Sequence, residues 1–162
     1  MAKLIQTAAA FHIDIHGPLP DMPAGLRTTP TAKQLNHDWI TAFNNRDWTA
    51  ETAIRTPGFL AHLSGAPGPL NFDAWNGFMQ AFTTAFPDSK ITIEECIAQG
   101  TRTATRRSLT GTHQGEFQGI PATGRRIHFQ GLEFNRLEGH QFAEHWSMFD
   151  NVSLLRQLGV LP

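Results

Sequence analysis

The chain has 162 residues, 40% of them hydrophobic, which is enough to form the core of one domain without disulfide bonds or a structural metal. Its net charge of -1 at pH 7 provides no basic surface for a nucleic acid, and the apolar stretch near its start is too short to span a bilayer. We therefore expect a small-molecule partner, neither a nucleic acid nor a membrane, and, because Cys96 is the single cysteine, a cytoplasmic location.

The first thirty residues differ in composition from the rest of the chain. Residues 17–30 carry four prolines and two glycines and show no helical or strand-like period. We interpret residues 1–30 as an N-terminal extension and residues 31–162 as one domain.

Three helices are predicted in the first half of that domain. Apolar residues recur at helical spacing from Thr31 to about Asn45, and a shorter helix is expected over residues 48–56, ending before Pro57. The stretch 58–69 is rich in glycine and proline and is expected to be a loop. Asn71 is a suitable N-cap for a third helix, which ends near Phe86. Its apolar side is aromatic and contains Phe72, Trp75, Phe78, Met79 and Phe82.

The period changes after Asp88, where side chains alternate in the manner of β-strands. Strands are predicted around Ile91 and Ile93 and over residues 102–110, 127–137 and 141–149. Asp150 can cap a closing helix over residues 151–158, with Gly159 just past its end. Helices followed by strands predict an α+β fold.

The last two predicted strands form a hairpin, and its turn fixes which side chains share a face. Residues 137–139 suit a three-residue loop with glycine in the left-handed conformation. That register places small and polar residues on one face, namely Phe129, Gly131, Glu133, Asn135, Ala143, His145, Ser147 and Phe149. The opposite face receives Leu132, Phe134, Phe142, Trp146 and Met148, together with His128, Gln130 and Glu144. Because such an apolar surface needs a cover, we expect a second subunit there.

The polar face indicates a site for proton transfer if it lies opposite the aromatic helices. Glu133 and His145 would then project into an apolar cavity, where burial raises the pKa of a carboxyl group towards the range of a general base. Each of the two residues could instead have a purely structural role. Glu133 could pair with Arg106 or Arg107, and His145 could bridge strands by hydrogen bonds.

Further candidates for the site have similar alternatives. Asp150 is a second-tier catalytic candidate that a helix cap would also explain. His113, between glycines, is either a ligand contact or part of a bent strand, and His62 lies in the loop expected over residues 58–69. The expected substrate-binding set therefore comprises His62, His113, Ser147, Phe129, Trp39 and Phe78. For the aromatic members, packing between helices and sheet is an equally sufficient account.

Five ordered segments carry a resemblance to a known family. They are Ala85-Phe86-Pro87-Asp88, the sequence GTHQG from Gly111, the sequence GIPATGRR from Gly119, the tripeptide EHW from Glu144 and the sequence RQLG from Arg156. With these segments the chain resembles the SnoaL-like polyketide cyclase or ester cyclase family of the nuclear transport factor 2-like superfamily. The resemblance implies a cone-shaped α+β barrel, in which a curved, mostly antiparallel sheet wraps about three helices around a deep apolar pocket. It also implies a homodimer or higher homo-oligomer and chemistry without a cofactor or a metal.

The resemblance bears directly on two positions of the predicted hairpin. In the polyketide cyclases, a catalytic aspartate lies three residues before the position matching Asp150, and this chain has Ser147 there. The histidine that supports that aspartate matches Glu133, so a carboxylate is expected on the other strand of the hairpin. We expect a cofactor-free enzyme that cyclises or isomerises a hydrophobic carbonyl compound, polyketide-like or ester-like. A non-catalytic small-molecule binder and a hydrolase that activates water in the same pocket are the alternatives.

Overall fold

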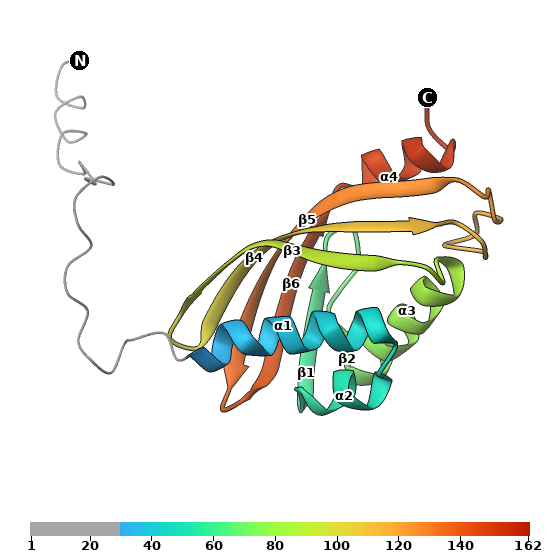
Figure 1. Ribbon diagram of the computed structural model, residues 1–162. Helices are drawn as coiled ribbons and strands as arrows, with labels where there is room; N and C mark the ends of the chain where they lie inside the picture. Colours follow the sequence, from blue (N-terminus) through green and yellow to red (C-terminus); the bar gives the residue numbers. More distant parts are fainter. Residues whose placement is uncertain (1–29) are drawn as a thin grey trace, which may run out of the picture.

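The computed structural model describes residues 30–162, so the expected N-terminal extension lies outside the described residues except for Pro30 (Figure 1). The elements are, in chain order, α1 (Pro30–Asn45), α2 (Trp48–Ala53), β1 (Arg55–Leu63), β2 (Leu70–Asn71), α3 (Phe72–Ala85), β3 (Lys90–Gln99), β4 (Arg102–Thr112), β5 (Arg126–Glu138), β6 (Gln141–Phe149) and α4 (Asn151–Leu158). None of the helices in this range is long and apolar enough to cross a membrane.

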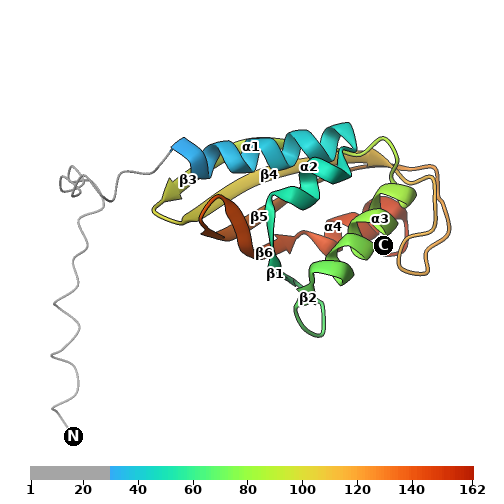
Figure 2. The same cartoon turned by 90° about the horizontal axis from the view of Figure 1, so that it is seen from below.

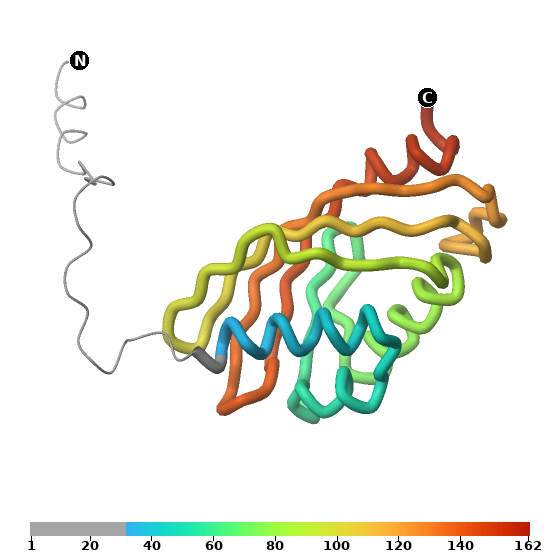
Figure 3. Tube along the Cα trace, in the orientation of Figure 1, coloured from blue at the N-terminus to red at the C-terminus, as the bar shows by residue number. Residues whose placement is uncertain are grey.

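The strands form one sheet in the order β2-β1-β6-β5-β4-β3. Only β1 and β6 are parallel, and all other neighbours are antiparallel. The long strands β3 to β6 bend strongly, as the ribbon and the tube show (Figures 1 and 3). Seen from below, α1 runs along β3 and β4 (Figure 2). This mixed architecture, with a curved and mostly antiparallel sheet packed against helices, confirms the predicted α+β fold.

Both predicted helix caps are present. The side chain of Asn71 accepts a hydrogen bond from the backbone N–H of Ala74 at 2.9 Å, and Asp150 accepts one from Ser153 at 2.9 Å. Gly159 ends α4 with a φ of 80°, the left-handed conformation that glycine adopts without strain. Local polar chemistry therefore defines α3 and α4 as the sequence predicted.

The segment between α2 and α3 was predicted wrongly. The second helix ends at Ala53 rather than near Thr56, and residues 55–63 form β1 instead of belonging to a loop. The pairing of β1 with β6 shifts between Arg55 and Leu60, and Pro57 lies in this irregular stretch, where it removes no ladder hydrogen bond. β1 pairs with only two residues of the nearby β2, and its longer pairing is with β6, about 85 residues further along the chain, so the local pattern indicated this strand poorly.

The β5–β6 hairpin has a different turn from the predicted one but the predicted faces. Glu138 pairs with Gln141, so the turn contains two residues rather than three, and a register shift follows between Arg136 and Leu137. The extra residue on β6 restores the parity, and Glu133 pairs with Ser147 on the inner face. Phe142 was assigned to the outer face, which is wrong, because it lies next to the shift and is 3% exposed.

Candidate active site

An apolar cavity of about 500 Å³ opens between the helices and the inner face of the sheet. Trp39 of α1, Phe78 of α3 and Phe129 of β5 lie on its wall, as do Leu154 and Leu158 of α4. The structure thus brings three of the predicted substrate-binding residues together. A cavity of this volume with mostly aromatic and aliphatic walls is typical of sites for small organic ligands.

Arg107 is the one charged side chain on the cavity wall in residues 30–162. It comes from β4, where Thr103, Thr105 and Leu109 share its inward face. Its guanidinium carbon lies 5.4 Å from the ring centre of Trp39 and 5.2 Å from that of Phe149, on the π-faces of both rings. The two rings flank the guanidinium, so its positive charge lies in apolar surroundings.

Gly131 makes room for this arginine. It pairs with Arg107 across β4 and β5, and a Cβ atom added to it would lie 3.3 Å from the Met148 carbonyl oxygen and 3.7 Å from the Arg107 Nε. An added side chain would crowd the backbone of β6 and come into contact with the guanidinium. The small residue on the predicted polar face is thus part of the site.

Glu133 lies behind Arg107, away from the cavity surface. Its Oε2 is 2.9 Å from Arg107 Nε, and Arg107 Nη2 donates a hydrogen bond to Ser147 Oγ at 3.1 Å. The Glu133 side chain is 0% exposed, and burial raises the pKa of its carboxyl group, while the charge of Arg107 opposes that rise. Arg107 therefore connects the cavity to both residues at the positions that the family resemblance singled out.

His145 faces inward as predicted but does not line the main cavity. Its ring lies 5.6 Å from that of Trp39 and 5.1 Å from that of Trp75, so the two indoles separate it from the cavity. Its Nδ1 is 2.7 Å from Asn135 Oδ1, and because Asn135 uses its amide group to donate elsewhere, Nδ1 carries the proton. Burial and then the charges of Arg107 and Arg55 hold the pKa of His145 well below its usual range.

Two other candidates lie away from the cavity. His62 is on β1 rather than in a loop, and its ring stacks on Trp146 at 5.0 Å on the outer side of the sheet. Asp150 caps α4 at the edge of the site, where its neighbour Asn151 is on the cavity wall. The structure therefore does not bring His62 and Asp150 into direct contact with the cavity.

His113 holds together a loop that forms part of the cavity wall. The ring is buried, stacks on Phe86 at 5.0 Å and accepts the backbone N–H of Thr123 at 3.2 Å through Nδ1. Burial lowers the pKa of His113. These contacts fasten residues 113–125, whose Phe117 and Gln118 line the cavity. The GTHQG and GIPATGRR segments are thus the two ends of one wall-forming loop.

Sequence reasoning missed two features of this site. Arg107 was considered only as a partner for Glu133, although its inward parity on β4 was a usable signal. The buried pair of Glu51 and Arg55 gave no signal, because both residues fell in the predicted helix 48–56, and an acidic and a basic residue four apart on a helix usually lie on the surface. In residues 30–162, no group of three or more histidine, cysteine or acidic side chains is arranged to hold a metal ion.

Comparisons with known proteins agree with this architecture. The family described as SnoaL-like polyketide cyclase matches residues 33–158. Aklanonic acid methyl ester cyclase DnrD of Streptomyces peucetius is 31% identical over 104 residues, which cover 64% of this chain and 70% of that protein. DauD of Streptomyces sp. (strain C5), of the same description, is also 31% identical over 104 residues, covering 64% of this chain and 63% of that protein.

Solved structures give the same result. IdmH of Streptomyces antibioticus, a proposed polyketide cyclase, has a TM-score of 0.72 and 32% identity, covering 79% of this chain and 98% of its own. AclR of Streptomyces galilaeus, a proposed hydroxylase, has a TM-score of 0.74 and 28% identity, covering 81% of this chain and 97% of its own. The fold is therefore one for which more than one activity has been proposed.

Proposed function

This chain belongs to the SnoaL-like polyketide cyclase family, and from that membership we propose that it is a cofactor-free cyclase or isomerase for a polyketide-like ester. The observation that carries the proposal is the position of Arg107. It is the one charged side chain on the wall of the apolar cavity in the described residues, and it is bound from behind by Glu133 and Ser147.

The proposed chemistry uses Arg107 and Glu133 together. A substrate carbonyl oxygen binds the guanidinium of Arg107, which stabilises the negative charge that develops when the adjacent carbon loses a proton. Glu133 accepts that proton once the guanidinium turns towards the substrate oxygen, and its raised pKa makes it a stronger base than an exposed glutamate. The enolate carbon then attacks a second carbonyl carbon of the same molecule, and the new alkoxide takes the proton back. Substrate and product have the same mass.

The remaining candidates receive supporting roles in this proposal. Ser147 fixes one end of the Arg107 guanidinium, and Asp150 holds α4 against the cavity. His113 holds the loop that carries Phe117. His145, which is neutral and lies behind the indoles, supports the wall rather than accepting the substrate proton.

We also propose a homodimer, formed through the outer face of the sheet. One row of side chains in register across β3, β4, β5 and β6 contains Ile97, Ala104, Phe134 and Trp146. Ile97 is 62% exposed and Phe134 is 40% exposed, and an apolar stripe of this kind is normally covered in solution. We propose that a second copy of the chain covers it.

We also propose a cytoplasmic location, which the single cysteine supports.

A non-catalytic binding protein is the second candidate. The observation that favours it is Ser147, which stands where the family resemblance places a catalytic aspartate, with a buried Glu133 as the nearest carboxylate. Such a protein would hold the ligand in the same cavity and release it unchanged.

The test is incubation of the protein with aklanonic acid methyl ester, the compound named for the two relatives, followed by chromatography and mass spectrometry. A cyclase yields a new compound of unchanged mass in which one C–H bond and one carbonyl group are replaced by a C–C bond and a hydroxyl group, as NMR of the purified product would show. An isomerase that returns the proton to another carbon forms a new C–H bond, which carries deuterium when the solvent is heavy water. A compound heavier by one water, or the free acid that forms when the ester takes up water and releases its alcohol, indicates a hydrolase. Tight binding with the ester recovered unchanged supports the binding protein and contradicts the proposal.

A further inference from the structure

Two tryptophans form a wall between the main cavity and a smaller chamber. Trp39 of α1 and Trp75 of α3 line both spaces. The chamber has a volume of about 10 Å³, enough for roughly one water molecule, and Arg55 and His145 are among its lining residues. The indoles therefore mark the inner end of the cavity in which the substrate is proposed to bind.

The chamber contains polar groups that the wall keeps from the main cavity. Arg55 Nε and Nη1 and His145 Nε2 are buried and have no hydrogen-bond partner in the described residues. Since Nδ1 of His145 carries the proton, its Nε2 is an acceptor, whereas the two arginine nitrogens are donors. Displacing either indole would join the polar chamber to the apolar main cavity and so change which molecules fit there.

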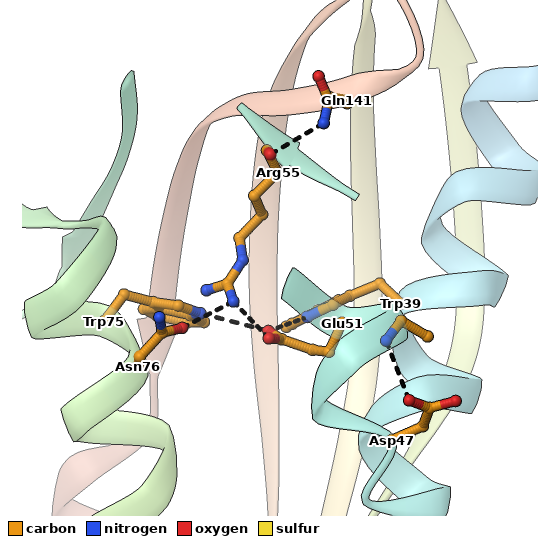
Figure 4. A network of polar contacts seen from close by, with 8 residues as sticks. Trp39, Asp47, Glu51, Arg55, Trp75, Asn76 and Gln141 are labelled. Carbon is orange, nitrogen blue, oxygen red and sulfur yellow. Dashed lines mark hydrogen bonds and ion pairs between the residues drawn. The ribbon is translucent and has the colours of Figure 1, made fainter. Parts of the chain in front are cut away.

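One carboxylate holds both indoles. Trp39 Nε1 donates to Glu51 Oε1 at 3.1 Å, and Trp75 Nε1 approaches the same oxygen at 3.5 Å (Figure 4). The other oxygen, Oε2, is paired with Arg55 Nη2, which also donates to Asn76 Oδ1 at 2.7 Å. Glu51, from α2, thus binds one side chain from α1 and one from α3.

The short helix α2 holds Glu51 next to the two indoles. It belongs to α2, a six-residue helix capped by Asp47, whose side chain accepts a hydrogen bond from the backbone N–H of Ala50 at 2.9 Å. Glu51 is 2% exposed and Arg55 is 2% exposed. A buried ion pair adds little net stability, but it restricts the geometry of the groups around it. An indole N–H without this acceptor would be buried and unsatisfied, so the bonds select one ring orientation for each tryptophan.

We propose that Glu51 is a positioning residue that fixes the wall of Trp39 and Trp75 and thereby sets the depth of the main cavity. The proposal rests on the proposed function in that the cavity is taken as the substrate pocket. Glu51 itself does not touch the substrate. Its effect is on specificity, because the wall decides how far an elongated ligand can enter.

Two double variants isolate the contribution of the acceptor. Glu51→Gln/Arg55→Met removes the ion pair but keeps an oxygen for the indoles, whereas Glu51→Leu/Arg55→Met removes both. The charge change is the same in each, and neither leaves an unpaired buried charge. Asn76→Ala is the matched control, since it removes a partner of Arg55 without touching either indole bond.

The first measurement is hydrogen exchange of the four indole N–H groups by two-dimensional NMR. In the wild type and in Glu51→Gln/Arg55→Met, those of Trp39 and Trp75 should exchange at least about tenfold more slowly than that of Trp48, which is 39% exposed. In Glu51→Leu/Arg55→Met the protection should be lost. If that variant does not fold, the wild type decides, because exchange of both indoles at the rate of Trp48 would overturn the proposal.

The second measurement is binding of methyl 2-naphthoate and methyl anthracene-2-carboxylate, two esters that differ by one fused ring. Removing the acceptor should shift the ratio of their dissociation constants at least about fivefold in favour of the longer ester, with Asn76→Ala and Glu51→Gln/Arg55→Met within about twofold of the wild type. An unchanged ratio after the indoles lose protection contradicts the proposal. Neither measurement needs turnover, so a protein that binds both esters but cyclises nothing would contradict the proposed function alone.

Discussion

Glu133 and Ser147 face each other across β5 and β6, and the guanidinium of Arg107 contacts both. The pair occupies the two positions at which the family resemblance places a histidine and an aspartate. The carboxylate is therefore on the opposite strand of the hairpin from the family pattern, yet it faces the same interior. Because Glu133 lies behind the cavity wall, the Arg107 side chain has to turn before the carboxylate can accept a proton from a ligand.

Arg107→Lys should lower kcat/KM for the ester about 10²-fold, because lysine keeps the charge but cannot contact Glu133 and Ser147 at once. The control is Arg106→Lys. Arg106 is the neighbour of Arg107 on the opposite face of β4, with its side chain 44% exposed, and its substitution should leave the kinetics unchanged. Steady-state kinetics on both variants is the check, and equal effects would exclude a specific role for Arg107.

The buried histidines His145 and His113 should make the folded protein less stable in acid. The pKa of His145 is depressed in the folded state, so below the ordinary histidine pKa of about 6.5 the unfolded chain binds a proton that the folded protein does not. The free energy of unfolding should fall as the pH drops from about 6.5 towards the folded pKa, and His113, whose pKa is also lowered, adds to the slope. His145→Asn keeps a donor for Asn135 and cannot titrate. Urea titrations between pH 5 and about 8 should show a shallower slope for this variant, and an identical slope would contradict the assignment.

Gly115→Ala should destabilise the protein by about 1–3 kcal/mol, because an added Cβ would lie 2.8 Å from the Thr84 carbonyl oxygen and 3.1 Å from the Ala85 Cα. Both are backbone atoms at the end of α3 and cannot move aside cheaply. Gly77→Ala is the counterpart, since Gly77 lies in α3 with open space around it and should stabilise by about 0.5–1 kcal/mol. Thermal unfolding of the two variants should therefore shift in opposite directions.

Charging the outer face should separate the proposed dimer. Leu132 and Met148 pair across β5 and β6 and are 58% and 65% exposed. Leu132→Lys/Met148→Lys should halve the mass measured by light scattering after size-exclusion chromatography. The control, Gln34→Lys/Gln80→Lys, adds the same charge on α1 and α3 and should keep the wild-type mass. A wild type that is monomeric at every concentration tested would refute the dimer.

Features fixed by local chemistry could be predicted from the sequence. Asn71 and Asp150 cap their helices through side chains three residues from the N–H groups they accept, so a short window contained the information. The inward direction of Glu133 and His145 followed from the period of two along a strand. It was preserved because the register shift beside Phe142 offset the unexpected turn.

Features that depend on distant pairing could not be predicted. Residues 55–63 form the strand β1 because they pair with β6. Pro57 and Gly58 are typical of loops, so the local sequence did not indicate a strand. The position of Arg107 on the cavity wall depends on Trp39 of α1 and Phe149 of β6, which flank the guanidinium and are distant in the sequence. Likewise, the burial of Glu51 depends on the meeting of α1, α2 and α3.

The most direct test of the account is the rate of ring closure in Glu133→Gln, with Glu138→Gln as its control on the same strand. Glu138 is 63% exposed and pairs with Arg136 outside the cavity, so its substitution should leave kcat unchanged. The account predicts that Glu133→Gln folds normally and loses about 10²–10⁴-fold in kcat, the usual contribution of a general base. Full activity of Glu133→Gln would contradict the assignment of Glu133 as the proton acceptor.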